Sequence, residues 1–311
     1  MASHVALRTT LSLLVVVCVV RLSLGHPNGS TASKSADVRE GKLLSRRYEA
    51  GEKLGYHMKG SNRGRLATTN YEADARGEVK RDAAGKFFEE YAWSNLMVNG
   101  KPVAVSSAAK DFRQSVSLDP GVTPSVPNLS QVIALIGPIT DLLTFYSDLW
   151  LANRLAELHR AGDHFYFARG TPNSWADGTY TVVGEDSIDF DLVLKEVDTA
   201  SHLATLVVRH VPPAKPQIKL PAEWMRAPVA ETPNNWVQVQ KSANGKYSAE
   251  VGKETFDVEL KVTLLDGEIV SATLDNPVEV LARECADVAL SSCGEPLRYQ
   301  IRRQIELAAA H

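Results

Sequence analysis

Alternation of apolar and polar residues predicts antiparallel β-strands over much of the chain. The clearest example spans residues 256–264, where apolar residues occupy every even position and polar residues every odd position. Successive side chains of a strand point to opposite faces, so this pattern predicts a sheet with one buried and one solvated face. Residues 54–59 and 87–93 show a similar pattern, with Phe87, Tyr91 and Trp93 on one face.

Turn signals separate these apolar runs. Asn99-Gly100 is a strong type I′ hairpin signal, because both positions of that turn favour residues that tolerate a positive φ. Asp266-Gly267 and Asn244-Gly245 are expected to form hairpins as well. Further strands are expected at residues 164–167, 180–183, 188–194, 203–211 and 299–307, and a short helix at 278–290.

Residues 129–160 change to a helical period. Ile139, Leu142, Leu143, Tyr146, Leu149 and Trp150 fall on one stripe of an α-helix. Pro138 fits as a first helical residue, so Gly137-Pro138 is expected to kink or restart the helix, with Asp141 in its first turn. The apolar surface of this segment is too broad for an exposed helix, so the sheet must cover it.

These patterns predict a mainly β (α+β) fold, in which a curved antiparallel sheet, an unclosed half-barrel, packs around the helix at 129–160. We expect one β-rich domain over residues 45–311. Similar turn sequences recur in both parts of the chain. Whether residues 45–127 and 163–308 are two related β-meander halves stays open.

The N-terminus has the three parts of a secretory signal peptide. A start with one positive charge and no acid precedes the apolar run at residues 11–20, and Ser23-Leu24-Gly25 supplies small residues for cleavage. The prediction is a signal peptide at 1–25 and a flexible leader at 26–44, with an uncleaved anchor as the alternative. We expect no transmembrane segment after signal cleavage, because no other apolar run is long enough.

Charge and cysteine content narrow the class of protein. The formal net charge is −3 with both signs interspersed, which gives no electrostatic argument for nucleic acid. Past the signal peptide the cysteines are Cys285 and Cys293. In an oxidising compartment this close pair predicts a disulfide, with two separate thiols as the alternative. Without a nearby histidine pair the two thiols make a poor zinc site.

Candidate catalytic groups are sparse. Glu185, Asp186, Asp189 and Asp191 form an acidic cluster, but Asp189 and Asp191 occupy expected solvent-facing positions of a half-buried strand. Asp163-His164 follows the long helix, where simple turn chemistry explains it. His210 shares a face with apolar neighbours and is expected to be a hydrogen-bonded core residue. Since no catalytic motif positions these side chains, we assign no catalytic, cofactor-binding or metal-binding residue.

Aromatic residues are the remaining clue to a binding site. Trp175 and Trp224 fall in irregular segments rich in proline or polar residues, and Trp150 and Tyr146 lie on the long helix. Aromatic rings in such places can line an apolar cavity, where the indole N–H finds a partner. The alternative is that they close the ends of the sheet. We take Tyr146, Trp150, Trp175 and Trp224 as ligand-lining candidates.

The order of segments resembles one bacterial group. An exported chain with aromatic antiparallel strands, one long apolar helix and further strands resembles the lipoprotein carriers of the LolA/LolB-like type. The segments YEAGEKLGYHMKG at 48–60 and GTPNSWADGTYTVVGEDSIDF at 170–190 are similar to secreted bacterial proteins. The resemblance implies an unclosed barrel whose concave apolar face holds acyl chains. The C-terminal cysteine pair departs from that group's pattern, and no functional residue of the group matches.

The expected function follows from these points. We expect an exported protein, periplasmic or extracellular, that binds an apolar or amphipathic ligand such as a lipid without catalysis. One alternative is an extracytoplasmic hydrolase that uses Asp163, His164 or the acids at 185–191. The other is a structural or protein-interaction module. An apolar cavity would favour the first, and a buried, hydrogen-bonded carboxylate or histidine in a cleft would favour the hydrolase.

Overall fold

The structure is a computed structural model. It describes residues 42–122, 124–125, 127–168, 173–175, 180–185, 189–211, 218–242 and 244–310, with backbone only at 173–175 and 180–185. The predicted signal peptide, the leader up to residue 41 and Asp186 lie outside the described residues.

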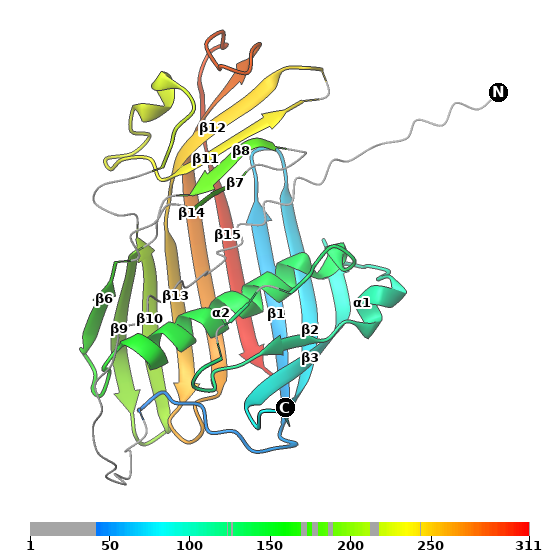
Figure 1. The fold of residues 1–311 in the computed structure, drawn as a ribbon, viewed down its shortest axis with the longest axis vertical. Coiled ribbons are helices and arrows are strands. Elements are labelled where there is room, and N and C mark those ends of the chain that lie inside the picture. The colour runs from blue at the N-terminus through cyan, green and yellow to red at the C-terminus, as the bar shows by residue number, and fades with distance from the viewer. Residues whose placement is uncertain are drawn as a thin grey trace, which may run out of the picture.

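One large antiparallel sheet dominates the fold and does not close into a barrel (Figure 1). This confirms the predicted fold class. The strands are β1 (Lys53–Arg63), β2 (Thr68–Arg81), β3 (Phe87–Val98), β4 (Lys101–Pro102), β5 (Gln114–Val116), β6 (His164–Phe167), β7 (Asn173–Trp175), β8 (Tyr180–Glu185), β9 (Asp189–Asp198), β10 (Leu203–Val211), β11 (Trp236–Lys241), β12 (Tyr247–Glu254), β13 (Phe256–Thr263), β14 (Ile269–Cys285) and β15 (Leu297–Ala309). β1 pairs with β15, so strands from the two ends of the described chain are neighbours.

The sheet divides into two branches beside its longest strand. β14 pairs with β15 along one edge, and along the other edge with β13 and then β12, in a register that continues across Thr255. Beyond these, β13 pairs with β10, whereas β12 pairs with β11. We call this division at Thr255, between β12 and β13, the fork. β10 belongs to the branch that starts at β13, and the fork places its end next to β12, where the other branch starts.

The long helix lies across one face of the sheet (Figure 1). A 3-10 turn, η1 (Ile133–Leu135), leads into α2 (Ile136–Leu155), and a short helix, α1 (Ser107–Asp111), precedes both. The predicted apolar stripe is buried, with Leu142 and Leu149 completely inaccessible. This confirms that the helix is covered by the sheet.

The helix is shorter than the predicted range of 129–160. Pro138 is the third residue of α2 and not the first, because the helix begins at Ile136, directly after η1, and runs through Gly137-Pro138. In this first turn the missing N–H of Pro138 costs no hydrogen bond. Asp141 is one turn further along than predicted, within the buried part of α2. At the other end the backbone becomes extended at Ala156.

The hairpin predicted at Asn99-Gly100 and the predicted disulfide are both confirmed. Asn99 and Gly100 both have positive φ, 50° and 73°, between β3 and β4. Cys285 and Cys293 form a disulfide with an Sγ–Sγ distance of 2.03 Å. Among the described helices, none is long and apolar enough to span a membrane.

The predicted short helix at 278–290 is wrong. Residues up to Cys285 belong to β14, where backbone groups pair with β12 on one side and β15 on the other. Val278 and Val280 lie on the face of β14 opposite Leu281. The short apolar run that contains them is compatible with a strand or a helix, so the sequence pattern could not distinguish the two. Pairing on both sides decides the outcome.

Candidate functional site

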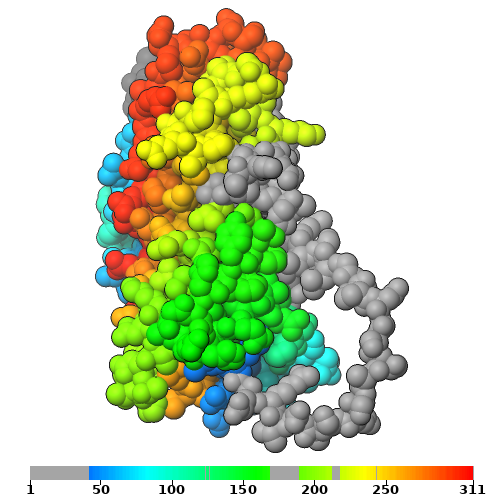
Figure 2. All heavy atoms as spheres, turned by 90° about the vertical axis from the view of Figure 1, so that its left-hand side faces the viewer, coloured from blue at the N-terminus to red at the C-terminus, as the bar shows by residue number. Residues whose placement is uncertain are grey.

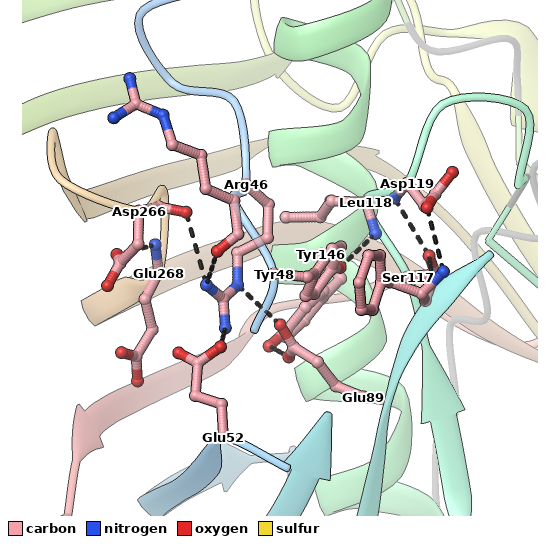
Figure 3. A network of polar contacts seen from close by, with 12 residues as sticks. Arg46, Tyr48, Glu52, Glu89, Ser117, Leu118, Asp119, Tyr146, Asp266 and Glu268 are labelled. Atoms are coloured by element: carbon pink, nitrogen blue, oxygen red, sulfur yellow. Dashed lines mark hydrogen bonds and ion pairs between the residues drawn. The ribbon is translucent and has the colours of Figure 1, made fainter. Parts of the chain in front are cut away.

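A buried carboxylate connects α2 with the sheet (Figure 3). Glu89 of β3 is 1 % exposed, and its carboxylate accepts hydrogen bonds from Arg46 Nε at 2.9 Å and from the Tyr91 hydroxyl at 2.8 Å. The hydroxyl of Tyr146, from α2, donates to the same carboxylate. Burial and the charge of Glu89 raise the pKa of both tyrosines well above the usual value, so their hydroxyls stay protonated.

Arg46 neutralises this carboxylate from the segment that precedes β1. Its Nη2 lies 2.8 Å from Glu52, and its Nη1 donates to the carbonyls of Arg47 and Asp266 at 3.0 and 3.4 Å. Burial alone would lower the pKa of Arg46, but Glu89 and Glu52 outweigh burial and raise it. Because the ion pairs and hydrogen bonds satisfy both charges, the network is suited to holding α2 in place.

A second polar contact lies near the start of α2. Asp141 is fully buried, forms an ion pair with Arg303 of β15 and accepts a hydrogen bond from the Tyr71 hydroxyl of β2. The Tyr71 hydroxyl also lies 3.1 Å from the sulfur of Met58. This contact therefore ties α2 to two strands of the sheet.

A third contact lies at the fork. His210 is the next-to-last residue of β10, and its Nε2 lies 2.8 Å from Asp148 Oδ1 of α2, with both side chains at most 3 % exposed. Glu254 ends β12 and accepts a hydrogen bond from the Asn276 amide at 3.1 Å. Burial raises the pKa of Glu254 to about 7, although Asn276 and the charge of His210 lower it.

Three buried atoms at the fork have no hydrogen-bond partner among the described residues. They are Asp148 Oδ2, His210 Nδ1 and Glu254 Oε2. Leaving such atoms unpaired is costly, which is why most buried polar groups in proteins are paired. The fork thus gathers three buried ionisable groups whose hydrogen bonding is incomplete. His210 itself is a buried residue on the face of Leu206 and Val208, as predicted.

A pocket lies in the segment of residues 218–234, which packs against the branch formed by β11 and β12. Its volume is about 440 Å³, and its lining residues are Ile218, Lys219, Leu220, Arg226, Pro233 and Asn234. This segment includes η2 (Glu223–Arg226) and is coloured yellow-green to yellow near the top of Figure 2. Asn234 stiffens the wall, because its amide donates to the carbonyls of Met225 and Ala227 at 2.7 and 2.8 Å.

The predicted ligand-lining residues do not meet around one cavity. Tyr146 is in the Glu89 network, and the indole N–H of Trp150 donates to the Val122 carbonyl at 2.7 Å. Trp224 lies in η2 on a separate apolar cluster, and its N–H donates to the Leu290 carbonyl at 3.3 Å. The side chain of Trp175 lies outside the described residues.

The candidate hydrolase residues are dispersed. Asp163 accepts backbone hydrogen bonds from His159 and Arg160, which is turn chemistry, and His164 pairs with Asp191 on the surface. The prediction that Asp189 faces solvent is wrong, because the side chain is 6 % exposed and accepts a hydrogen bond from Tyr166. β6 pairs alongside β9 and brings Tyr166 over Asp189, which the sequence spacing could not indicate.

Three carboxylates offer a cation-sized arrangement. Ligand atoms of Glu52, Asp266 and Glu268 lie within 4.8 Å of one another. Asp266 is already used as a turn acceptor for Thr263 and for the Glu268 backbone, and Glu52 is paired with Arg46. These existing partners explain the cluster without a metal ion.

Sequence reasoning missed Glu89, Asp141 and Asp148. A signal was present for each, because Glu89 occupies an inward position between Phe87 and Tyr91, and both aspartates interrupt an apolar helix. A charged residue at a core position implies a buried partner. Arg46 carried no such signal, since the segment before β1 has no regular period.

Comparison with known proteins does not assign a family. The chain matches no protein-family model, and no curated protein matches its sequence. The resemblance to LolA/LolB-like carriers stays a prediction.

Proposed function

We propose that this is an exported, non-catalytic binding protein for an amphipathic ligand that carries an apolar part and an anionic group. The observation that carries the proposal is the pocket of about 440 Å³ in the 218–234 segment. This volume falls in the range of small-molecule sites. The disulfide between Cys285 and Cys293 is compatible with an oxidising compartment.

The chemistry of the lining determines the expected ligand class. Ile218, Leu220 and Pro233 offer apolar surface, while Lys219 and Arg226 bring positive charge to the same pocket. A long-chain carboxylate matches both features, because its chain gains from leaving water and its head group gains from the cations.

Binding explains this lining better than catalysis does. Among the described lining residues the side chains are apolar, cationic or amide, and Lys219 has no carboxylate, histidine, hydroxyl or thiol side chain beside it in the lining to act as its acid or base, as general acid–base or nucleophilic catalysis requires. Lys219 is exposed and has no ion-pair partner among the described residues. The head group of a ligand could therefore use it without breaking an existing contact.

A calorimetric titration with palmitate tests the proposal, and hexadecanol serves as the uncharged analogue. We expect palmitate to bind more tightly than hexadecanol, and Lys219→Ala combined with Arg226→Ala to remove that preference. Lys59→Ala is the matched control, because Lys59 is an exposed lysine on β1. Equal binding of both probes, no binding, or loss of the preference in the control would overturn the proposal.

A further inference from the structure

The polar contacts of α2 differ in their response to pH. Asp141 pairs with Arg303, and Tyr146 donates to Glu89, which is paired with Arg46. Arginine stays charged at all physiological pH values. Asp148 instead pairs with His210. Histidine is the side chain whose ordinary titration falls between pH 5 and 8. Of these three contacts, therefore, the one at the fork contains the side chain whose charge can respond to pH.

The surroundings of His210 leave few ways to compensate such a change. Asp148 faces it from α2 and Glu254 from β12, and these are the charged groups around it in the described core. β9 and β13 contribute rings, with centroid distances of 4.6 Å to Phe190 and 5.2 Å to Phe256. Neither ring can take up or release a proton.

Proton release from the fork creates unpaired negative charge. A neutral His210 ring gives the two buried carboxylates beside it, Asp148 and Glu254, no positive charge, and buried negative charge without compensation is costly. A protonated ring instead balances the charge of Asp148, and burial favours the protonated form of Glu254, whose pKa it raises to about 7. The compensated arrangement is the acidic one.

We propose that His210 and Asp148 form a pH-operated latch, which holds the second half of α2 on the sheet in mild acid and loosens it above neutral pH. The first half stays fixed by Arg303 at either pH. Loosening exposes the apolar face of β10 and β13 below the fork, including Val208 and Val258, which are fully buried when α2 is seated. The latch does not depend on the proposed ligand.

Hydrogen exchange of the full chain, read by mass spectrometry at pH 6 and pH 8 and corrected for intrinsic rates, tests the latch. An equilibrium linked to one proton changes by up to about tenfold per pH unit. We expect the opening of residues 149–155 to rise by about tenfold or more between the two values, while residues 138–144 change little. Asp148→Asn should abolish the difference, because it removes the charge that responds to His210.

His164→Gln is the matched control, since His164 forms a similar pair with Asp191 on the surface, away from α2. It should retain the wild-type difference. If Asp148→Asn fails to fold, Glu254→Gln provides the second variant and should reduce the difference. Equal opening of residues 149–155 at both pH values in the wild type, or a full response in a folded Asp148→Asn variant, would overturn the latch.

Discussion

Replacing Arg46 with methionine should be among the most damaging single changes in the protein. Methionine keeps much of the apolar stem but removes the guanidinium that neutralises Glu89 at 2.9 Å. Among the described residues, the buried carboxylate then keeps the hydroxyls of Tyr91 and Tyr146 as partners. Removing one partner of a buried ion pair costs about 3–5 kcal/mol, against a total stability of about 5–15 kcal/mol.

Companion variants separate the loss of a charge from the loss of packing. Glu89→Gln removes the buried charge, while Arg46 keeps Glu52 at 2.8 Å, so this change should cost less than Arg46→Met. The double variant, Arg46→Met with Glu89→Gln, should be more stable than the sum of the two single effects predicts. We expect a coupling energy of about 1–3 kcal/mol.

Urea unfolding at pH 7 and pH 5 measures these differences. A buried carboxylate without a cation takes up a proton more readily, so the deficit of Arg46→Met should shrink at pH 5. The reasoning fails if Arg46→Met unfolds within about 1 kcal/mol of the wild type, or if the two substitutions simply add.

Four further predictions rest on the same structure. Leu143→Ala should cost about 2–5 kcal/mol in urea melts, because α2 is core, and a wild-type midpoint would contradict this. Glu254 has a pKa of about 7 in the folded protein, above its ordinary value of 4.5, so its contribution to stability is lost as pH rises through 7. Glu254→Gln should remove that loss in urea melts measured from pH 5 to 8. Thiol titration of denatured, unreduced mature protein should find neither Cys285 nor Cys293 free. N-terminal sequencing of exported material should begin at His26, and a start at Met1 would refute cleavage.

The sequence by itself determined the features that depend on local periodicity. Alternation over residues 256–264 assigns one face of β13 to the core, because the strand period of two holds wherever the strand pairs. The stripe through Leu142 and Leu149 marks the buried helix in the same way. Asn99-Gly100 identifies a hairpin, because few other residue pairs adopt its positive φ values.

Tertiary structure alone decided which of these faces meet. Arg46 and Glu89 come from different segments, and no local pattern pairs them. Residues 278–285 became strand because β12 pairs with all of them along one edge and β15 pairs with residues 278–282 along the other. His210 and Asp148 meet because α2 lies across the face of the sheet that carries His210 (Figure 1). Periodicity tells which side of an element is buried, whereas the partner of a buried charge depends on how the whole chain is connected.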